Sequence, residues 1–94
     1  MVIRSFRDRE TQRVWSGVRS RRLPSEMQDV ALRKLRQLNQ SRTLEDLRAP
    51  PGNRLEALTG NRRGQYSIRV NGQWRICFTW REGEAEDVEI CDYH

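Results

Sequence analysis

The sequence ends in Asp92-Tyr93-His94, three side chains that can accept or donate protons. His94 is the only histidine of the chain, and histidine is the side chain that titrates near neutral pH without perturbation. Tyr93 adds a phenol that can donate a proton or stack on a nucleic-acid base. Because a chain terminus is usually the least ordered part of a domain, this cluster is either a free tail or part of an active site.

Cleavage of an RNA backbone is one reaction that these groups could support. It requires a base for the 2′-hydroxyl, an acid for the leaving 5′-oxygen and cations for the phosphate charge. His94 can act as the acid or the base, and Arg69 and Arg75 can hold the phosphate. Glu56 is a further carboxylate, which can act as a base if its pKa is raised. One histidine and two cysteines give no recognised ligand spacing, so we expect neither a metal ion nor a cofactor.

Charge is distributed unevenly along the chain. The formal net charge is +5, but residues 82–94 contain six carboxylates and no lysine or arginine. Residues 1–81 therefore carry 18 basic against seven acidic side chains, a net +11. Every cation except Lys34 is an arginine, whose planar fork matches a phosphate. Two interpretations remain open, a nucleic-acid-binding surface and the solvated surface of a protein from an arginine-rich, GC-biased genome.

The length of 94 residues allows a single domain spanning 1–94. No run approaches the roughly 18 apolar residues of a membrane span, and the N-terminus lacks the apolar segment of a signal peptide. We expect a cytoplasmic protein without membrane contacts. In that compartment Cys77 and Cys91 are expected to be reduced thiols, although the strand pairing below makes them diagonal neighbours.

The first half of the chain is predicted to be mainly helical. The pattern indicates a short strand over 2–6, a brief helix to about Ser16 with Asp8 as its N-cap, and a second helix from about Glu26 to Gln40. Ser25 and Gln28 have the spacing of a capping box at the start of the second helix. A basic loop over 19–22 joins the two helices, and a partial helical turn over 43–47 ends at Pro50-Pro51-Gly52.

The second half has a period of two and predicts antiparallel strands over 54–58, 65–70, 74–81 and 86–93. A three-residue loop at 71–73, with Gly72 in the left-handed conformation, places Val70 opposite Trp74 and Ile68 opposite Ile76. A two-residue turn would mix polar with apolar side chains on each face, so we prefer the longer loop. A turn centred on Gly83 extends the pattern to the last strand.

These pairings predict one apolar and one polar face of the sheet. Phe78 is expected opposite Val88 and Ile76 opposite Ile90, and the two helices cover this apolar face. On the polar face Arg69 and Arg75 lie directly opposite each other, an arrangement of like charges that is destabilising without an anion between them. Glu89, diagonal to Arg75, is one such anion, and an RNA phosphate is the other.

The order of elements, the strand Trp74-Arg75-Ile76-Cys77-Phe78 and the terminal Asp92-Tyr93-His94 resemble the HigB branch of the RelE-type toxins of bacterial toxin–antitoxin systems. The resemblance implies an α+β, microbial-ribonuclease-like fold, with an N-terminal strand and two helices packed on a mainly antiparallel sheet. It also implies a metal-independent endoribonuclease that cuts mRNA in the ribosomal A site and thereby inhibits translation and growth. The implied partners are a HigA-type helix-turn-helix antitoxin, mRNA and ribosomal RNA, and operator DNA only through the antitoxin complex.

The resemblance also assigns roles to individual residues. Arg75, Tyr93 and His94 match catalytic positions, whereas Glu56 and Thr59 stand where some relatives have histidine and lysine. Arg62 and Arg63 in the adjacent loop could supply the cation that Thr59 lacks, and together with Arg69 and Thr59 they are the expected phosphate-binding residues. The Thr59 departure keeps an alternative open, a RelE-like module of weak or no catalytic activity that binds antitoxin or nucleic acid without cleaving RNA.

Overall fold

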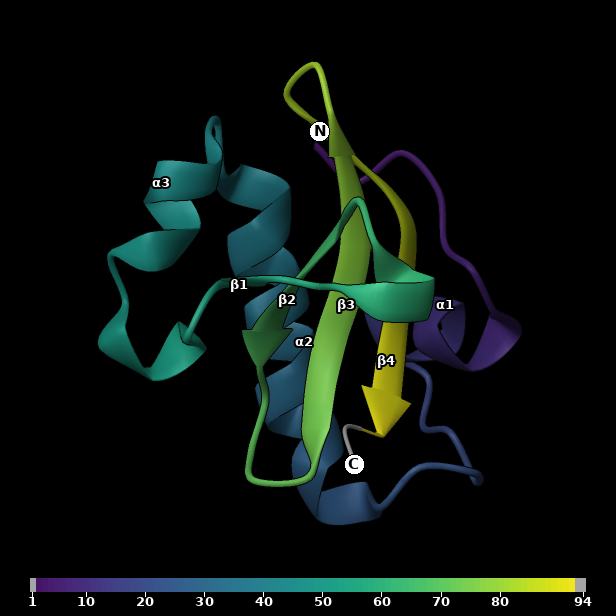
Figure 1. Ribbon diagram of the computed structural model, residues 1–94. Coiled ribbons are helices and arrows are strands. Elements are labelled where there is room, and N and C mark those ends of the chain that lie inside the picture. Colours follow the sequence, from purple (N-terminus) through teal and green to yellow (C-terminus); the bar gives the residue numbers. More distant parts are fainter. Residues whose placement is uncertain (1, 93–94) are drawn as a thin grey trace.

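The alternating second half of the chain folds into an antiparallel sheet in the order β1-β2-β3-β4. The computed structural model describes residues 2–92 (Figure 1). The strands are β1 (Glu56–Ala57), β2 (Gln65–Arg69), β3 (Trp74–Arg81) and β4 (Glu84–Asp92). The helices are α1 (Arg9–Trp15), α2 (Ser25–Gln40) and α3 (Leu44–Arg48), with 3-10 turns η1 (Pro51–Asn53) and η2 (Gly60–Arg62). The expected small α+β fold is confirmed.

The apolar face of the sheet packs against α1 and α2, which lie behind it in Figure 1. Ile68, Ile76, Phe78 and Val88 are fully buried there. The apolar stripe of α2 supplies the opposite side of the core with Met27, Ala31, Leu35 and Leu38. Burying each large aliphatic or aromatic side chain stabilises the fold by roughly 1.5–3 kcal/mol. The hydrophobic pattern therefore determines which face of the sheet the helices cover and which face stays available for binding.

The β2–β3 hairpin has the predicted register, with Tyr66 opposite Phe78 and Ile68 opposite Ile76. Its loop is also the predicted one, since the backbone N–H of Val70 donates to the carbonyl of Trp74 at 2.9 Å. The expected left-handed glycine is wrong, because Gly72 does not have a positive φ. The side chain of Asn71 shapes the turn instead. Its Oδ1 accepts from the backbone N–H groups of Gln73 at 2.8 Å and of Trp74 at 2.9 Å.

The β3–β4 hairpin confirms one predicted pairing and corrects another. Ile76 lies opposite Ile90 as expected. The turn, however, is a two-residue one at Glu82-Gly83, where both residues have positive φ (51° and 80°). A β-bulge then shifts the register, so that Phe78 has no single partner in place of the predicted pairing with Val88. The bulge includes Asp87 at φ 52°, and the extra residue restores the apolar face beyond it.

The predicted N-terminal strand is reduced to two isolated bridges. Ile3 pairs with Ala85 and Phe6 with Val88, both in parallel orientation along the outer edge of β4. The helix that follows begins as predicted. The carboxylate of Asp8 accepts from the backbone N–H of Thr11 at 2.7 Å, which satisfies an N–H that the helix itself cannot pair.

The capping box predicted for α2 is wrong. The helix begins at Ser25 after Pro24, and no side chain caps it. The side chain of Gln28 turns away from the helix end and hydrogen-bonds to the preceding loop. A capping box forms instead at α3, between Thr43 and Asp46. Hydrogen bonds from the backbone N–H groups of Arg42 and Thr43 lower the pKa of Asp46.

Within residues 2–92, no helix has the length and apolarity needed to cross a bilayer. The same residues contain no cluster of three or more histidine, cysteine, aspartate or glutamate side chains that could hold a metal ion.

Candidate active site

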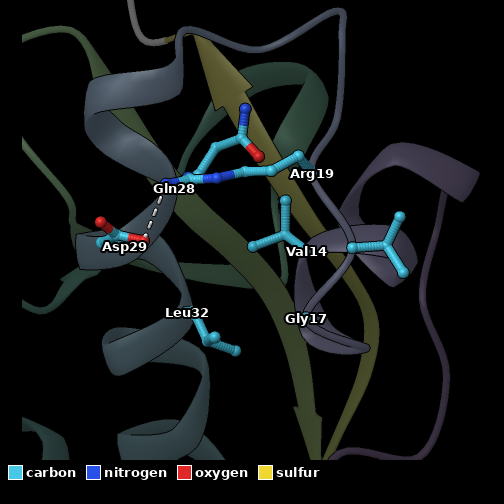
Figure 2. Close-up of a pocket in the computed structure, with 7 residues that line it drawn as sticks. Val14, Gly17, Arg19, Gln28, Asp29 and Leu32 are labelled. Carbon is cyan, nitrogen blue, oxygen red and sulfur yellow. Dashed lines mark ion pairs between the residues drawn. The ribbon is translucent and has the colours of Figure 1, made fainter.

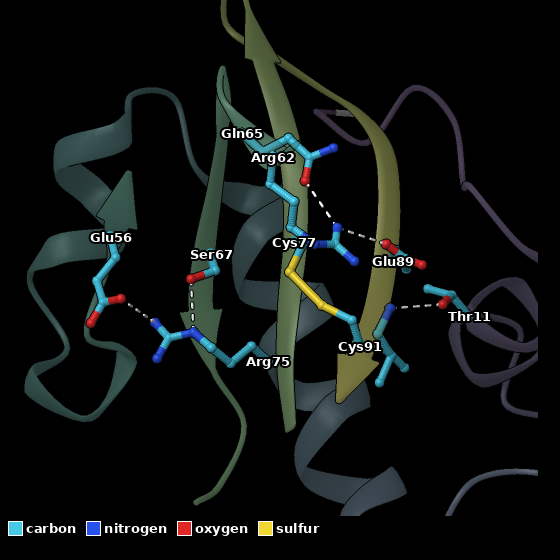
Figure 3. Close-up of a disulfide and its surroundings, with 10 residues drawn as sticks. Thr11, Glu56, Arg62, Gln65, Ser67, Arg75, Cys77, Glu89 and Cys91 are labelled. Atoms are coloured by element: carbon cyan, nitrogen blue, oxygen red, sulfur yellow. Dashed lines mark hydrogen bonds and ion pairs between the residues drawn. A yellow bond between two sulfur atoms is a disulfide. The ribbon is translucent and has the colours of Figure 1, made fainter. Parts of the chain in front are cut away.

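The polar face of the sheet carries two adjacent rows of side chains. Glu56, Ser67, Cys77 and Glu89 lie opposite one another in turn across β1, β2, β3 and β4. The next row contains Arg69, Arg75 and Cys91, so the predicted pairing of Arg69 with Arg75 is confirmed. Figure 3 shows this face, with Glu56 at one end and Glu89 at the other.

Arg75 is the best-anchored cation of this face. Its Nε donates to the Oγ of Ser67 at 2.7 Å, and its Nη2 donates to the carbonyl oxygen of Arg54 at 2.7 Å (Figure 3). Nη2 also lies 4.0 Å from Oε2 of Glu56. Arg75 is only 6 % exposed and Ser67 is fully buried. The guanidinium is therefore held in one orientation in a poorly solvated position, where its charge acts more strongly on an anion than it would in water.

The chain bends sharply to bring a carbonyl to this guanidinium. Arg54 follows η1 and has φ 44° and ψ 57°, a left-handed conformation that is uncommon for a residue with a side chain. It directly precedes the segment leading into β1, whose Glu56 provides the neighbouring carboxylate. The segment from Arg54 to Glu56 thus supplies both a backbone and a side-chain oxygen to Arg75.

Glu89, one of the two anions considered for the Arg69–Arg75 pair, forms its ion pair with Arg62. Glu89 accepts from Nη1 of Arg62 at 3.1 Å, and the same nitrogen donates to Oε1 of Gln65 at 3.1 Å. Arg62 comes from η2, and the chain between β1 and η2 passes in front of β3 in Figure 1. The carboxylate beside Arg75 is instead Glu56, which the sequence had suggested as a base. Because Arg62 is engaged with Glu89, Arg63 is the exposed arginine of this loop, next to the exposed Thr59.

The expectation of two reduced thiols is also wrong. Cys77 and Cys91 form a disulfide between β3 and β4, on the same face as Arg75 (Figure 3). Both are buried. Cys91 is the cross-strand partner of Arg75, so the bond ties the arginine-bearing strand to the strand that leads to the terminal residues.

Tyr93 and His94, two of the predicted catalytic residues, lie outside the described residues. The described part of β4 ends at Asp92, whose carboxylate accepts from Nε2 of Gln73 at 3.1 Å.

Comparison with known proteins decides the family. A family model described as "RelE-like toxin of type II toxin-antitoxin system HigB" matches residues 4–94. The chain belongs to the HigB-like toxin family. It is 42 % identical over 81 residues to Toxin HigB-1 of Vibrio cholerae, covering 85 % of each chain. It is also 42 % identical over 41 residues to Endoribonuclease HigB of Proteus vulgaris, covering 44 % of this chain and 45 % of that protein.

The fold of this HigB-like toxin also matches a solved structure. The YoeB–YefM complex from Staphylococcus aureus contains a chain that superposes with a TM-score of 0.62 at 18 % identity, covering 98 % of this chain and 97 % of that one. The family match, and not this likeness of fold, makes the chain the toxin component of a type II system, whose counterpart is an antitoxin.

Sequence reasoning missed two contributors to the site, Ser67 and the carbonyl of Arg54. Ser67 is two residues from Arg69 and so falls on the same, polar face of the predicted sheet. Its signal was available, because the predicted register makes Ser67 a diagonal neighbour of Arg75, within reach of a long side chain. The carbonyl of Arg54 had no such signal, since its position depends on the left-handed turn after η1.

Proposed function

We propose that this HigB-like toxin is a metal-independent endoribonuclease that cuts mRNA in the ribosomal A site and so arrests translation. The observation that carries the proposal is the buried guanidinium of Arg75, held by Ser67, by the carbonyl of Arg54 and by Glu56 on the polar face of the sheet. A fixed cation of this kind stabilises charge that develops on a phosphate during cleavage without having to reorganise. The endoribonuclease name of the Proteus vulgaris relative supports the same reaction.

In the proposed reaction, a base removes the proton of a 2′-hydroxyl and the resulting oxygen attacks the adjacent phosphorus. The bond to the 5′-oxygen breaks, and an acid protonates that oxygen as it leaves. Arg75 neutralises the charge on the five-coordinate phosphate. His94 is the proposed acid or base, Tyr93 stacks on a base or donates a proton, and Glu56 is the alternative base.

The remaining predicted residues are proposed to hold the RNA backbone near the scissile bond. Arg69 lies opposite Arg75 on the neighbouring strand. Thr59 and Arg63 are exposed on the loop between β1 and β2. Arg62 contributes its charge only in competition with Glu89, to which it is already bound.

For the partners, we propose an antitoxin of the HigA type with a helix-turn-helix domain, ribosomal RNA next to the mRNA, and operator DNA bound only through the toxin–antitoxin complex. Cytoplasmic localisation follows from these partners.

The test is primer extension on mRNA taken from translating ribosomes incubated with purified toxin. Arg75→Ala and His94→Ala should each lower the rate of cleavage by roughly 100-fold or more, as loss of one preorganised donor does in other enzymes. Arg81→Ala is the matched control, because Arg81 lies on the same strand but is exposed at its far end, 3.8 Å from Glu86. Full activity of the folded Arg75→Ala protein would refute the role of Arg75. Intact mRNA with the wild-type toxin, together with normal antitoxin binding, would favour the non-catalytic binding module.

A further inference from the structure

The connector between α1 and α2, residues 16–24, is locked in place by a buried glutamine. Gln28 of α2 is only 3 % exposed. Its Nε2 donates to the carbonyls of Ser20 and Leu23, and its Oε1 accepts from the backbone N–H of Ser20, all at 2.9 Å. Figure 2 shows the side chain of Gln28 extending from α2 toward the connector, which carries Arg19. A loop with this much buried hydrogen bonding has a defined shape.

The connector and α1 together bring arginines around one hollow. The hollow has a volume of about 410 Å³ and is lined by four arginines, Val18 and Glu10. The four arginines are Arg13, Arg19, Arg21 and Arg22. The one carboxylate at the hollow is Glu10, whose Oε1 accepts from the Oγ of Ser20 at 2.5 Å and keeps its charge, so the lining carries four positive charges against one negative.

Three of these four cations are not neutralised within the part of the chain that the structure describes. Arg19 lies 3.3 Å from Asp29, an ion pair drawn in Figure 2. Arg13, Arg21 and Arg22 take part in none of the ion pairs among residues 2–92. Holding like charges together is unfavourable, so a helix and a fixed loop that do so are suited to an anionic ligand.

We propose that the connector is a second RNA-binding site, which takes backbone phosphates at a distance from the scissile one. This inference rests on the proposed function only in taking RNA as the ligand. Arginine forks bind phosphate oxygens in a bidentate way. An acidic protein partner fits less well, because the cores of protein interfaces are apolar and aromatic. Val18, 49 % exposed, is the one large hydrophobic side chain exposed among residues 2–92.

The connector and Arg75 lie on opposite sides of the sheet, so a ligand that contacts both must be a chain. α1 is tied to β4 by a hydrogen bond from the backbone N–H of Ile90 to Oγ1 of Thr11, at 2.9 Å. The connector continues from this helix layer, which covers the sheet face opposite Arg75. A single phosphate cannot contact both Arg75 and the connector, whereas an extended or folded RNA can pass around the edge of the sheet.

The test measures binding, not cleavage. The probe is a fluorescein-labelled single-stranded RNA of about 20 nucleotides with 2′-O-methyl groups, which cannot be cut, followed by fluorescence anisotropy at several salt concentrations. The double variant Arg21→Ala/Arg22→Ala should bind more weakly. It should also flatten the plot of log affinity against log salt by roughly 0.7 for each lost phosphate contact, about 1.4 in total. The matched control is Arg33→Ala/Arg36→Ala, which removes the same charge from exposed positions of α2.

A further variant separates the shape of the loop from its charge. Gln28→Leu leaves every arginine in place but removes the three hydrogen bonds of the lock, and it should reproduce part of the loss in affinity. If the Gln28→Leu protein fails to fold, the salt dependence of RNA binding by the Arg21→Ala/Arg22→Ala variant still tests the proposal.

The proposal would be overturned if the Arg21→Ala/Arg22→Ala and Arg33→Ala/Arg36→Ala variants gave the same slope of log affinity against log salt. Unchanged RNA binding combined with a loss of antitoxin binding would also overturn it, and would assign the connector to a protein partner. Suppose that the wild-type toxin does not cut mRNA on ribosomes, but that the Arg21→Ala/Arg22→Ala variant still has a flatter salt dependence of RNA binding than the wild type. The proposed function then fails, and the second RNA-binding site stands.

Discussion

The hydrogen bond between Arg75 and Ser67 gives the sharpest test of the candidate site. Ser67→Ala removes the oxygen that accepts from Nε of Arg75 at 2.7 Å, between a fully buried serine and an arginine that is 6 % exposed. No water can easily replace that oxygen. A hydrogen bond to a charged group contributes about 1.5–3 kcal/mol, so the free energy of unfolding should fall by that amount. The melting temperature should fall by about 4–8 °C for each kcal/mol.

The assay is urea denaturation followed by tryptophan fluorescence, which the three tryptophans of the chain make possible. Ser16→Ala is the matched control, because Ser16 is exposed at the end of α1, and it should change stability by less than about 0.5 kcal/mol. In an Arg75→Met background, Ser67→Ala should cost much less, because the buried N–H that needs the oxygen is gone. The reasoning is refuted if Ser67→Ala costs no more than Ser16→Ala, or costs the same with and without Arg75.

Two further predictions concern stability. Cys77 and Cys91 are 14 positions apart, and a disulfide closing a loop of this size stabilises by about 3 kcal/mol. A reductant should therefore lower the melting temperature of the wild-type protein and leave a Cys77→Ala/Cys91→Ala variant unchanged; equal responses would show that the bond is absent in solution. Because the pKa of Asp46 is lowered by the cap of α3, its contribution is present above the unfolded value of about 3.9 and is lost as pH falls through the folded value. The difference in melting temperature between wild type and Asp46→Ala should accordingly be constant near neutral pH and shrink below about pH 4; a difference that persists in acid would contradict this account.

The register of the β2–β3 hairpin could be predicted because its alternation is strict. Shifting Ile68 and Ile76 by one residue would move both to the wrong face, so the core determines the pairing. The bulge at Asp87 could not be read in the same way. It arises because the two-residue turn at Glu82-Gly83 sets one register and the core sets another, and an inserted residue reconciles them.

Local motifs were less reliable than the core pattern. Ser25 and Gln28 have the residue types of a capping box, but the connector offers Gln28 two carbonyls and an N–H in a buried position. Tertiary hydrogen bonds outweighed the local one. The placement of Arg75 on the polar face, by contrast, followed directly from the alternation of side chains along β3.

The hydrogen-bond and ion-pair partners of the site residues could not be predicted from the alternation of side chains along the strands. Glu89 was diagonal to Arg75 in the predicted sheet, yet it binds Arg62 because the chain from β1 to η2 passes across β3. The order of residues does not reveal where a loop outside the sheet returns to it. The disulfide was disfavoured on the basis of compartment rather than geometry, and it was the geometry of the two strands that brought Cys77 to Cys91.

The N-terminal segment has a consequence for how the sheet can meet other chains. Along the outer edge of β4, backbone groups of residues 2–7 exchange four hydrogen bonds with Ala85 and Val88, at 2.8–3.0 Å. At the opposite edge, β1 has only two residues. Exposed strand edges invite pairing with a foreign strand and, with it, aggregation. In the described part of the chain one edge is occupied and the other is too short to act as a template. Strand donation by a partner is therefore disfavoured, and recognition of this toxin is left to its side chains.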